Sequence, residues 1–225
     1  MITIEQVKKT YVTGDVEVEA LRGVDLTISD GEFISIAGPS GSGKTTLLNL
    51  IGCIDSLDSG RILIDEKPVF ELNKDEKALF RRETLGFIFQ SYNLIPVLTA
   101  YENVAFALNL LDLDDKEIKE RTMAILKEVG LEGMENRRPN KLSGGQQQRV
   151  AIARALVKNP KIILADEPTA NLDSHTGEDI LKLMREMNEK HGTTFIFSTH
   201  DKMVMDYAKR LVLLHDGLIQ SDETR

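Results

Sequence analysis

Cysteine, positive charge and long apolar runs are all scarce in this sequence. The 225 residues include a single cysteine, Cys53, so no disulfide can form within the chain, and this suits a reducing compartment. The net charge of −8 argues against a nucleic-acid-binding surface, because such surfaces are basic. No apolar run approaches the roughly 18 residues of a membrane span. The opening residues 1–11 lack the apolar core of a signal peptide, so we expect a soluble, globular chain.

Cys53 lies in the apolar run "LLNLIGCI". A cysteine in such a run is more often a buried side chain than a reactive thiol. We therefore expect Cys53 to be buried.

The order of hydrophobic patterns indicates the fold class. Strand patterns cover residues 21–28, 32–38, 60–65, 85–90, 161–168 and 193–200, and helical patterns cover 45–54, 73–83, most of 99–130 and 176–192. Residues 210–220 have the pattern of a hairpin that turns at Asp216 and Gly217. Buried strands that alternate with helices predict an α/β fold with a mainly parallel sheet, and the early alternating strands predict an additional antiparallel β layer.

We expect one domain over residues 1–225. Residues 1–70 and 146–225 would form the core and the β layer, and residues 71–145 would form an inserted α-helical subdomain, because this stretch interrupts the alternation of strands and helices. Thr99 and Glu102 are spaced as a capping box that opens the helical region.

A glycine-rich loop lies between a predicted strand and a predicted helix. Its sequence, "GPSGSGKTT", fits the phosphate-binding pattern G-x-x-x-x-G-K-[ST], and its residues are Gly38, Pro39, Ser40, Gly41, Ser42, Gly43, Lys44, Thr45 and Thr46. The glycines allow backbone N–H groups to surround phosphate oxygens, Lys44 supplies a positive charge, and the Thr45 hydroxyl is placed to bind Mg²⁺. A plain glycine turn with a surface lysine would not need a strand before it and a helix after it. The loop predicts a P-loop NTPase (RecA-like) core.

Two acidic residues end the predicted strand "IILADE". Buried charge is costly unless it is paired or bound to a metal, so Asp166 and Glu167 are hard to explain by packing alone. Asp166 could hold Mg²⁺ through water, and Glu167 could polarise a water molecule that attacks a γ-phosphate. The alternative, solvated acids at an exposed strand end, is weaker in a chain that also carries a P-loop.

A second glycine-rich entrance to a helix occurs in "LSGGQQQRVAIARAL". Ser143 and Gln146 are spaced as a capping box, which accounts for these two residues but not for Gly144 and Gly145 between them. Side-chain-free residues at a helix entrance can form a second anion cradle. One triphosphate is already surrounded by the P-loop, so we expect the second cradle to close on a nucleotide from the opposite side.

The three motifs "GPSGSGKT", "LSGGQ" and "ILADEPT", in this order, resemble the nucleotide-binding subunit of ATP-binding cassette (ABC) transporters over the whole chain. This resemblance implies that the chain binds ATP and Mg²⁺ and forms a head-to-tail dimer with a second copy of itself. In such a dimer the P-loop of one copy faces the LSGGQ segment of the other. The trans arrangement follows from the resemblance and not from the pattern alone.

The resemblance also assigns residues outside these motifs. It implies that Tyr11 stacks on adenine, that Gln90 reaches Mg²⁺ and the attacking water, and that His200 contacts the γ-phosphate; "ANLD", which ends at Asp173, would cross the dimer interface. The alternative for Tyr11 is an ordinary tyrosine on a strand face. The implied catalytic residues are Glu167, His200 and Gln90, and the implied metal ligands are Thr45, Gln90 and Asp166. Surface positions are expected for His175, His191, His215, Arg81, Arg82, Arg137 and Arg138.

Residues 91–98 resemble the surface that meets an integral membrane permease subunit in this family. The segment is unusually apolar for a loop, since it contains Tyr92, Leu94, Ile95, Val97 and Leu98. The alternative is that these side chains pack beneath the helical insertion.

The loop sequences "GCIDSLDSG" and "GFIFQSYNLIPVLTAYENV" resemble those of the family branch that contains the lipoprotein-releasing and macrolide-exporter ATPases. Two functions stay open within it: the ATPase subunit of a lipoprotein- or macrolide-type extruder, and a cell-division cassette that regulates a cell-wall hydrolase without transport. A soluble cassette of DNA repair or translation would show coiled-coil insertions, a second cassette or basic patches, which this sequence lacks. Either remaining function implies a position on the cytoplasmic face of the inner membrane and no nucleic-acid partner.

Overall fold

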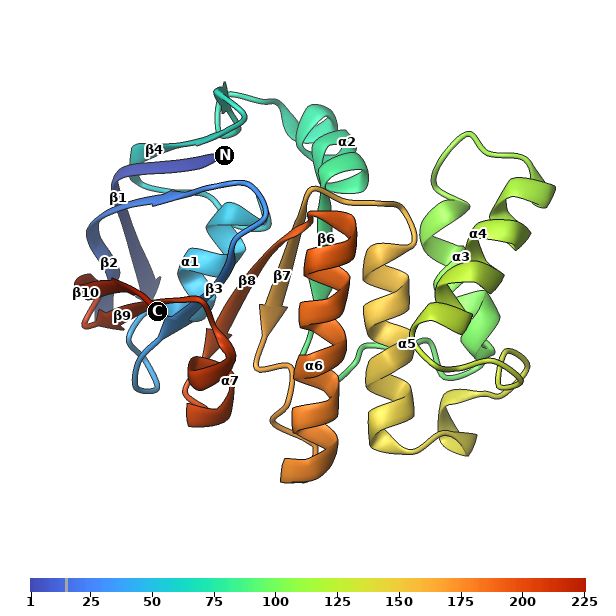
Figure 1. The fold of residues 1–225 in the computed structure, drawn as a ribbon. Helices are drawn as coiled ribbons and strands as arrows, with labels where there is room; N and C mark the ends of the chain where they lie inside the picture. The colour runs from blue at the N-terminus through green and yellow to red at the C-terminus, as the bar shows by residue number, and fades with distance from the viewer. Residues whose placement is uncertain (15) are drawn as a thin grey trace. The chain divides into compact units, whose positions relative to one another are not determined.

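The computed structural model describes residues 1–14 and 16–225, and these form two compact units. The first unit comprises Met1–Arg81 and Thr194–Arg225, and the second comprises Arg82–Thr193. Each unit contains part of the predicted parallel sheet and its own helices (Figure 1). The predicted boundary of a helical subdomain at residues 71–145 is a different division and stays a prediction.

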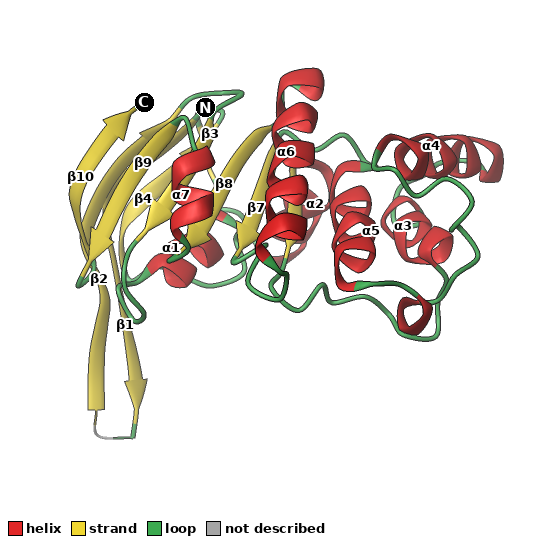
Figure 2. Ribbon diagram, turned by 60° about the horizontal axis from the view of Figure 1, so that its bottom comes forward, coloured by secondary structure: helices red, strands yellow, loops and turns green. Residues whose placement is uncertain are grey.

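An antiparallel four-stranded sheet forms one layer of the first unit, as predicted. Its strands are β1 (Ile2–Thr13), β2 (Val16–Ile28), β4 (Ser59–Ile64) and β5 (Lys67–Pro68), in the order β2-β1-β4-β5. Buried and exposed residues alternate along the second half of β2, because one face packs on the core and the other meets solvent. Figure 2 shows that β1 and β2 extend as a two-stranded arm beyond the rest of this sheet.

A mainly parallel group of strands forms the second layer of the first unit. It consists of β3 (Phe33–Ala37), β8 (Thr194–Thr199), β9 (Arg210–His215) and β10 (Leu218–Thr224). β3 pairs in parallel with β8 and with β9, and β10 returns antiparallel to β9 through the predicted turn at Asp216 and Gly217. Every residue of β3 and β8 is buried, which explains why these segments read as continuous apolar runs. Helices α1 (Lys44–Ile51) and α7 (Lys202–Tyr207) follow β3 and β8 along the chain.

The second unit combines one parallel strand pair with a group of helices. The pair is β6 (Leu85–Ile88) and β7 (Ile162–Asp166), and the helices are α3 (Ala100–Leu108), α4 (Asp115–Glu128), α5 (Gly144–Leu156) and α6 (Ser174–His191), with a 3-10 turn at Pro139–Lys141. Helix α2 (Lys74–Thr84) precedes β6. Helix α5 packs against α3, α4 and α6. Both predicted capping boxes are present: Thr99 with Glu102 at the start of α3, and Ser143 with Gln146 at the start of α5.

Several local expectations need correction. The helix predicted over residues 45–54 ends at Ile51, because Gly52 caps it and Cys53 has a left-handed backbone with φ of 52°. Cys53 is buried, as expected, and burial raises the pKa of its thiol to about 11. Arg81 and Arg82 are half-buried and not fully solvated: their guanidinium groups donate hydrogen bonds to the carbonyl oxygens of Cys53 and Leu110.

Within residues 1–14 and 16–225, no helix combines the length and the apolar composition that a membrane span requires.

Candidate functional site

The glycine-rich loop of the first unit connects β3 to α1. Gly43 caps α1 with φ of 102°, and a Cβ there would come within 2.4 Å of the Ala20 carbonyl oxygen, so only glycine fits. The buried Lys44 side chain folds back over the loop. Its Nζ donates hydrogen bonds to the carbonyl oxygens of Gly38 and Pro39, both at 2.8 Å. The sequence thus produces a closed loop with one cation held at its centre.

The entrance to α1 has the properties of an anion site. No side chain caps the helix, and its first turn contains no acidic residue. The Ser42 hydroxyl is buried and has no hydrogen-bond partner among the described residues. Backbone N–H groups at a helix N-terminus, an adjacent lysine and an unsatisfied hydroxyl together fit a phosphate group.

His200 lies beside the start of this loop. Ala37 at the end of β3 is paired in register with Thr199 at the end of β8, so Gly38 and His200 leave neighbouring strands at the same edge. The turn after His200 is fixed by two hydrogen bonds, from Asp201 N–H to the Thr199 hydroxyl and from Met203 N–H to the Asp201 carboxylate. The structure therefore brings the exposed His200 and the P-loop together, as parallel strands with a common carboxyl edge require.

The strand ends of the second unit carry the predicted acidic residues. Ile88 of β6 pairs with Ala165 of β7, so the segment that leads to Gln90 and the acids Asp166 and Glu167 leave the same edge. Glu167 is a non-glycine residue with φ of 46°, a conformation that costs energy and is concentrated at functional sites. The Asn171 side-chain amide donates a hydrogen bond of 2.9 Å to the Gln90 carbonyl oxygen, which ties the two loops together.

The entrance to α5 has a packing explanation that sequence reasoning missed. A Cβ on the buried Gly145 would lie 2.5 Å from the Thr176 methyl group of α6, and one on Gly144 would lie 3.1 Å from the Tyr92 hydroxyl. Close approach thus accounts for Gly145, and the surroundings of Gly144 are tight. Ser143 is the exposed N-cap, and its hydroxyl accepts a hydrogen bond from Gln146 N–H.

Asp173 also has a local structural role. It caps α6, since its carboxylate accepts hydrogen bonds from the Thr176 backbone N–H at 3.0 Å and from the Thr176 hydroxyl at 2.7 Å. These hydrogen bonds from Thr176 lower the pKa of Asp173. The residue is exposed, and its place in a dimer interface stays a prediction.

Gln148 is a buried residue near the site that the sequence interpretation left out. It is fully buried on α5, and its side-chain amide donates a hydrogen bond of 2.7 Å to the Pro168 carbonyl oxygen, directly after Glu167. The bond clamps the strained turn to the helix that begins at Ser143. A sequence signal existed, because Gln148 shares the buried face of α5 with Ala151, Ile152 and Ala155.

A second missed residue is Asn103 on α3. Its side chain is buried and makes four hydrogen bonds to residues 95–99: the Ile95 N–H donates to Oδ1, and Nδ2 donates to the carbonyl oxygens of Ile95, Leu98 and Thr99. Asn103 therefore fixes the path of the second half of residues 91–98, which we call the docking segment.

The docking segment itself is only partly exposed. Val97 is 70% exposed, whereas Tyr92, Leu94, Ile95 and Leu98 are half-buried. Val97 is thus presented to solvent, whereas the other four side chains pack partly against the unit, and the docking role of the segment stays a prediction.

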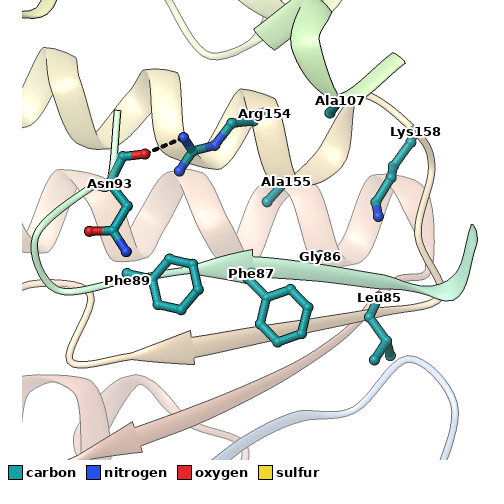
Figure 3. Close-up of a pocket in the computed structure, with 9 residues that line it drawn as sticks. All are labelled: Leu85, Gly86, Phe87, Phe89, Asn93, Ala107, Arg154, Ala155 and Lys158. Carbon is teal, nitrogen blue, oxygen red and sulfur yellow. Dashed lines mark hydrogen bonds between the residues drawn. The ribbon is translucent and has the colours of Figure 1, made fainter. Parts of the chain in front are cut away.

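A pocket of about 230 Å³ adjoins this segment (Figure 3). Its lining residues are Leu85, Gly86, Phe87, Phe89, Asn93, Ala107, Arg154, Ala155 and Lys158. Arg154 donates hydrogen bonds to the carbonyl oxygens of Asn93 at 2.5 Å and Tyr92 at 2.7 Å. Burial lowers the pKa of Arg154, and burial together with the charge of Arg82 lowers the pKa of Lys158 to about 8. The pocket is lined by aromatic residues of β6 and the segment after it, and by two basic residues, Arg154 near the end of α5 and Lys158 just beyond it.

The predicted site residues fall into two groups. Tyr11, His200 and residues 38–46 lie in the first unit, and Gln90, Ser143, Gly144, Gly145, Gln146, Asp166, Glu167 and Asp173 lie in the second. The predicted metal ligands Thr45, Gln90 and Asp166 offer hydroxyl, amide and carboxylate oxygens, which is the donor set that Mg²⁺ prefers. Their roles stay predictions.

A glycine-rich loop between a buried strand and a helix, at the carboxyl edge of a mainly parallel sheet, defines a P-loop nucleotide-binding protein. Residues 21–170 match the ABC transporter family. The chain belongs to this family and is its ATP-binding domain.

Relatives and solved structures of this family resemble the whole chain. The ABC transporter ATP-binding protein MJ0796 of Methanocaldococcus jannaschii is 48% identical, and the match covers 99% of this chain and 97% of that protein. A solved dimeric structure of MJ0796 in a post-hydrolysis state, bound to ADP and Pi, has a TM-score of 0.91 at 47% identity and covers 100% of this chain and 98% of that one.

Further relatives are longer than this chain. The macrolide export ATP-binding/permease protein MacB of Brucella melitensis is 48% identical; the match covers 100% of this chain but 35% of that protein. The chain thus spans about a third of the length of the MacB proteins that it matches.

Proposed function

We propose that this chain binds and hydrolyses ATP as the cassette subunit of a transporter and powers a membrane permease through ATP-driven dimer closure. The observation that carries the hydrolytic part is the turn at Glu167. An acidic residue ends a buried strand in a left-handed conformation, and Gln148 of α5 clamps this turn. A left-handed non-glycine residue of this kind is concentrated at functional sites, which supports a catalytic role for this carboxylate.

The geometry of the P-loop and the neighbouring His200 supports the proposed roles in phosphate binding. Backbone N–H groups of residues 38–46 surround the β- and γ-phosphates, Lys44 supplies the charge, and His200 contacts the γ-phosphate from the neighbouring strand end. Tyr11 offers a ring to adenine. Thr45, Gln90 and Asp166 would hold Mg²⁺, which supplies neutralisation of phosphate charge when it is bound.

Glu167 is the proposed general base. A carboxylate at this position accepts a proton from the attacking water, while Gln90 orients that water. Gln148 and Asn171 act on these residues indirectly, because their amides bind the carbonyl oxygens of Pro168 and Gln90.

The proposed dimer is head to tail, with Ser143, Gly144, Gly145 and Gln146 facing the γ-phosphate held by the second copy. An N-cap serine on an exposed helix entrance can hold a phosphate as well as its own helix. The dimeric structures of MJ0796 support such self-association.

The proposed membrane partner docks on residues 91–98 and the adjoining pocket. Apolar and aromatic side chains beside the half-buried Arg154 and Lys158 fit a helix that carries both apolar residues and a carboxylate. We propose macrolide-type or lipoprotein-releasing extrusion, at the cytoplasmic face of the membrane, on the strength of the MacB relatives. Regulation of a cell-wall hydrolase through a membrane partner remains the alternative function.

Replacing Glu167 with glutamine tests the enzymatic proposal. Glu167→Gln keeps the shape of the side chain but removes the base, so steady-state phosphate release should fall by roughly 10²–10⁴-fold while ATP binding persists. Phosphate release should be measured at saturating MgATP, and binding by calorimetry. Turnover within a few-fold of the unsubstituted chain would overturn the assignment of Glu167.

A further inference from the structure

Tyr11 is held by a network that the proposed function does not use. The ring lies on β1, in the two-stranded arm, and 37% of the residue is exposed. Its hydroxyl donates a hydrogen bond of 2.6 Å to the Asp55 carboxylate, and it also interacts with the Thr46 hydroxyl at the end of the P-loop. An exposed ring near the end of an arm is thus tied at its tip to the segment that follows the P-loop helix.

Lys9 completes this network from beneath. Its Nζ lies 5.1 Å from the centroid of the Tyr11 ring, over one face, and 3.3 Å from the Asp55 carboxylate. Ser56 and Asp58 also lie within 3.5 Å and 3.8 Å of Nζ. The Lys9 side chain is only 9% exposed, so its cation is enclosed between the ring and the loop. One face of the ring is therefore covered by the Lys9 cation, while 37% of the residue stays exposed.

The loop that carries Asp55 is strapped to the same strand. The Asp58 N–H donates to the Lys8 carbonyl oxygen at 3.0 Å, and the Asp58 carboxylate accepts a hydrogen bond of 2.6 Å from Thr10 N–H. Burial opposes ionisation of Asp55, but hydrogen bonds from Tyr11, Ser56 N–H and Lys9 outweigh it and lower the pKa of this carboxyl. Asp55 thus stays a charged acceptor at neutral pH.

We infer that Asp55 and Lys9 are positioning residues that lock the Tyr11 ring so that its open face receives the base of the nucleotide bound by the P-loop. This inference rests on the proposed nucleotide-binding function and deepens it. A ring that is fixed before binding loses no rotamer freedom when the base stacks on it, and this raises affinity. Because stacking recognises the flat face of a base, the network acts on affinity for nucleosides and not on affinity for phosphates.

Calorimetric titration of the full chain with MgADP, and competition by magnesium pyrophosphate, tests this inference, because pyrophosphate lacks a base. Asp55→Ala, Lys9→Met and Tyr11→Phe should each weaken MgADP binding by roughly three- to tenfold, and none should change pyrophosphate binding. Tyr11→Phe and Asp55→Ala both remove the same hydrogen bond, the one between Tyr11 and Asp55. The double variant should therefore bind MgADP no more weakly than the weaker-binding of the two single variants. Asp55→Asn keeps an acceptor oxygen and should restore most of the affinity.

Glu5→Ala is the matched control. It removes a carboxylate from the same strand, where Glu5 pairs with Arg61 on the surface, and should leave both affinities unchanged. Thermal unfolding of each variant checks that the fold is intact.

Three results would overturn the inference, and they separate it from the proposed function. If Tyr11→Ala weakens MgADP binding and Asp55→Ala does not, the ring binds the base without positioning. If Asp55→Ala weakens pyrophosphate binding as much as MgADP binding, the network only supports the P-loop helix. If Lys44→Ala leaves both affinities unchanged, the proposed nucleotide site itself is wrong.

Discussion

Lys44 is the cation at the centre of the P-loop, and its contacts give a specific expectation. Nζ already lies within 2.8 Å of two loop carbonyl oxygens, so a phosphate would meet a charge that is fixed in place. Lys44→Ala should therefore weaken MgATP binding more than tenfold, because it removes a ground-state phosphate contact.

Titration with MgATP measures this, and Lys116→Ala, which removes a highly exposed lysine on α4, is the control. Unchanged affinity in Lys44→Ala would contradict the proposed role. Because Lys44 also binds the loop carbonyl oxygens, the thermal unfolding of the Lys44→Ala protein should be compared with that of the unsubstituted chain.

Individual residues differ in how far the sequence reveals them. Ser143 and Gln146 could be predicted as a capping box, because both partners lie within one turn of the chain. Gly145 could not be explained in this way, since its reason is the Thr176 methyl group, about thirty residues away in sequence and adjacent only in the fold. Gln148 and Asn103 were missed because polar residues on a buried helix face are usually taken as exceptions, although each satisfies a specific backbone carbonyl here.

One substitution in the docking segment and one in helix α3 can be compared directly. Val97→Glu changes an exposed side chain and should leave the free energy of unfolding and the basal hydrolysis rate unchanged, while it abolishes co-purification with the membrane subunit. Asn103→Ala leaves the Ile95 N–H and nearby carbonyl groups without their partner, so it should reduce the free energy of unfolding by about 1–3 kcal/mol.

Chemical denaturation of the isolated chain measures both effects. If Val97→Glu destabilises the chain as much as Asn103→Ala, then Val97 is a packing residue and the docking surface lies elsewhere. If Val97→Glu still co-purifies with the membrane subunit, the proposed docking surface is also wrong.

Strands and helices were predictable to the extent that their periodicity is local. The alternation in residues 21–28 and the buried runs of β3, β7 and β8 follow from burial on one or two faces. Helix α7 was missed because six residues give too little periodicity to detect. Helix α1 ends early because Cys53 has a left-handed backbone, and a cysteine in an apolar run does not predict that conformation.

The whole chain carries its motifs in two groups that the order of the sequence does not separate. Residues 38–46 and His200 belong to the first unit although more than 150 residues lie between them, and Gln90 joins Glu167 in the second. Parallel strand pairing accounts for both groupings, because residues that follow paired strands meet at one edge. The sequence supplied the motifs, and only the strand register shows which of them are neighbours.

Ser143 tests self-association in trans more cleanly than Gly145 does. An aspartate at Gly145 would collide with Thr176, so a loss of function there would have two causes. Aspartate and asparagine are both good N-caps, so each should keep α5 intact at position 143. Only the aspartate places a negative charge against the partner's γ-phosphate.

The decisive measurement is the mass of the chain by size-exclusion chromatography with light scattering, with ATP and with ADP. Glu167→Gln should run as a dimer with ATP and as a monomer with ADP. Adding Ser143→Asn should preserve the dimer, whereas adding Ser143→Asp should give a monomer that still binds ATP in calorimetry. A Glu167→Gln/Ser143→Asp protein that dimerises with ATP as fully as Glu167→Gln alone would rule out a head-to-tail dimer in which Ser143 faces the partner's γ-phosphate.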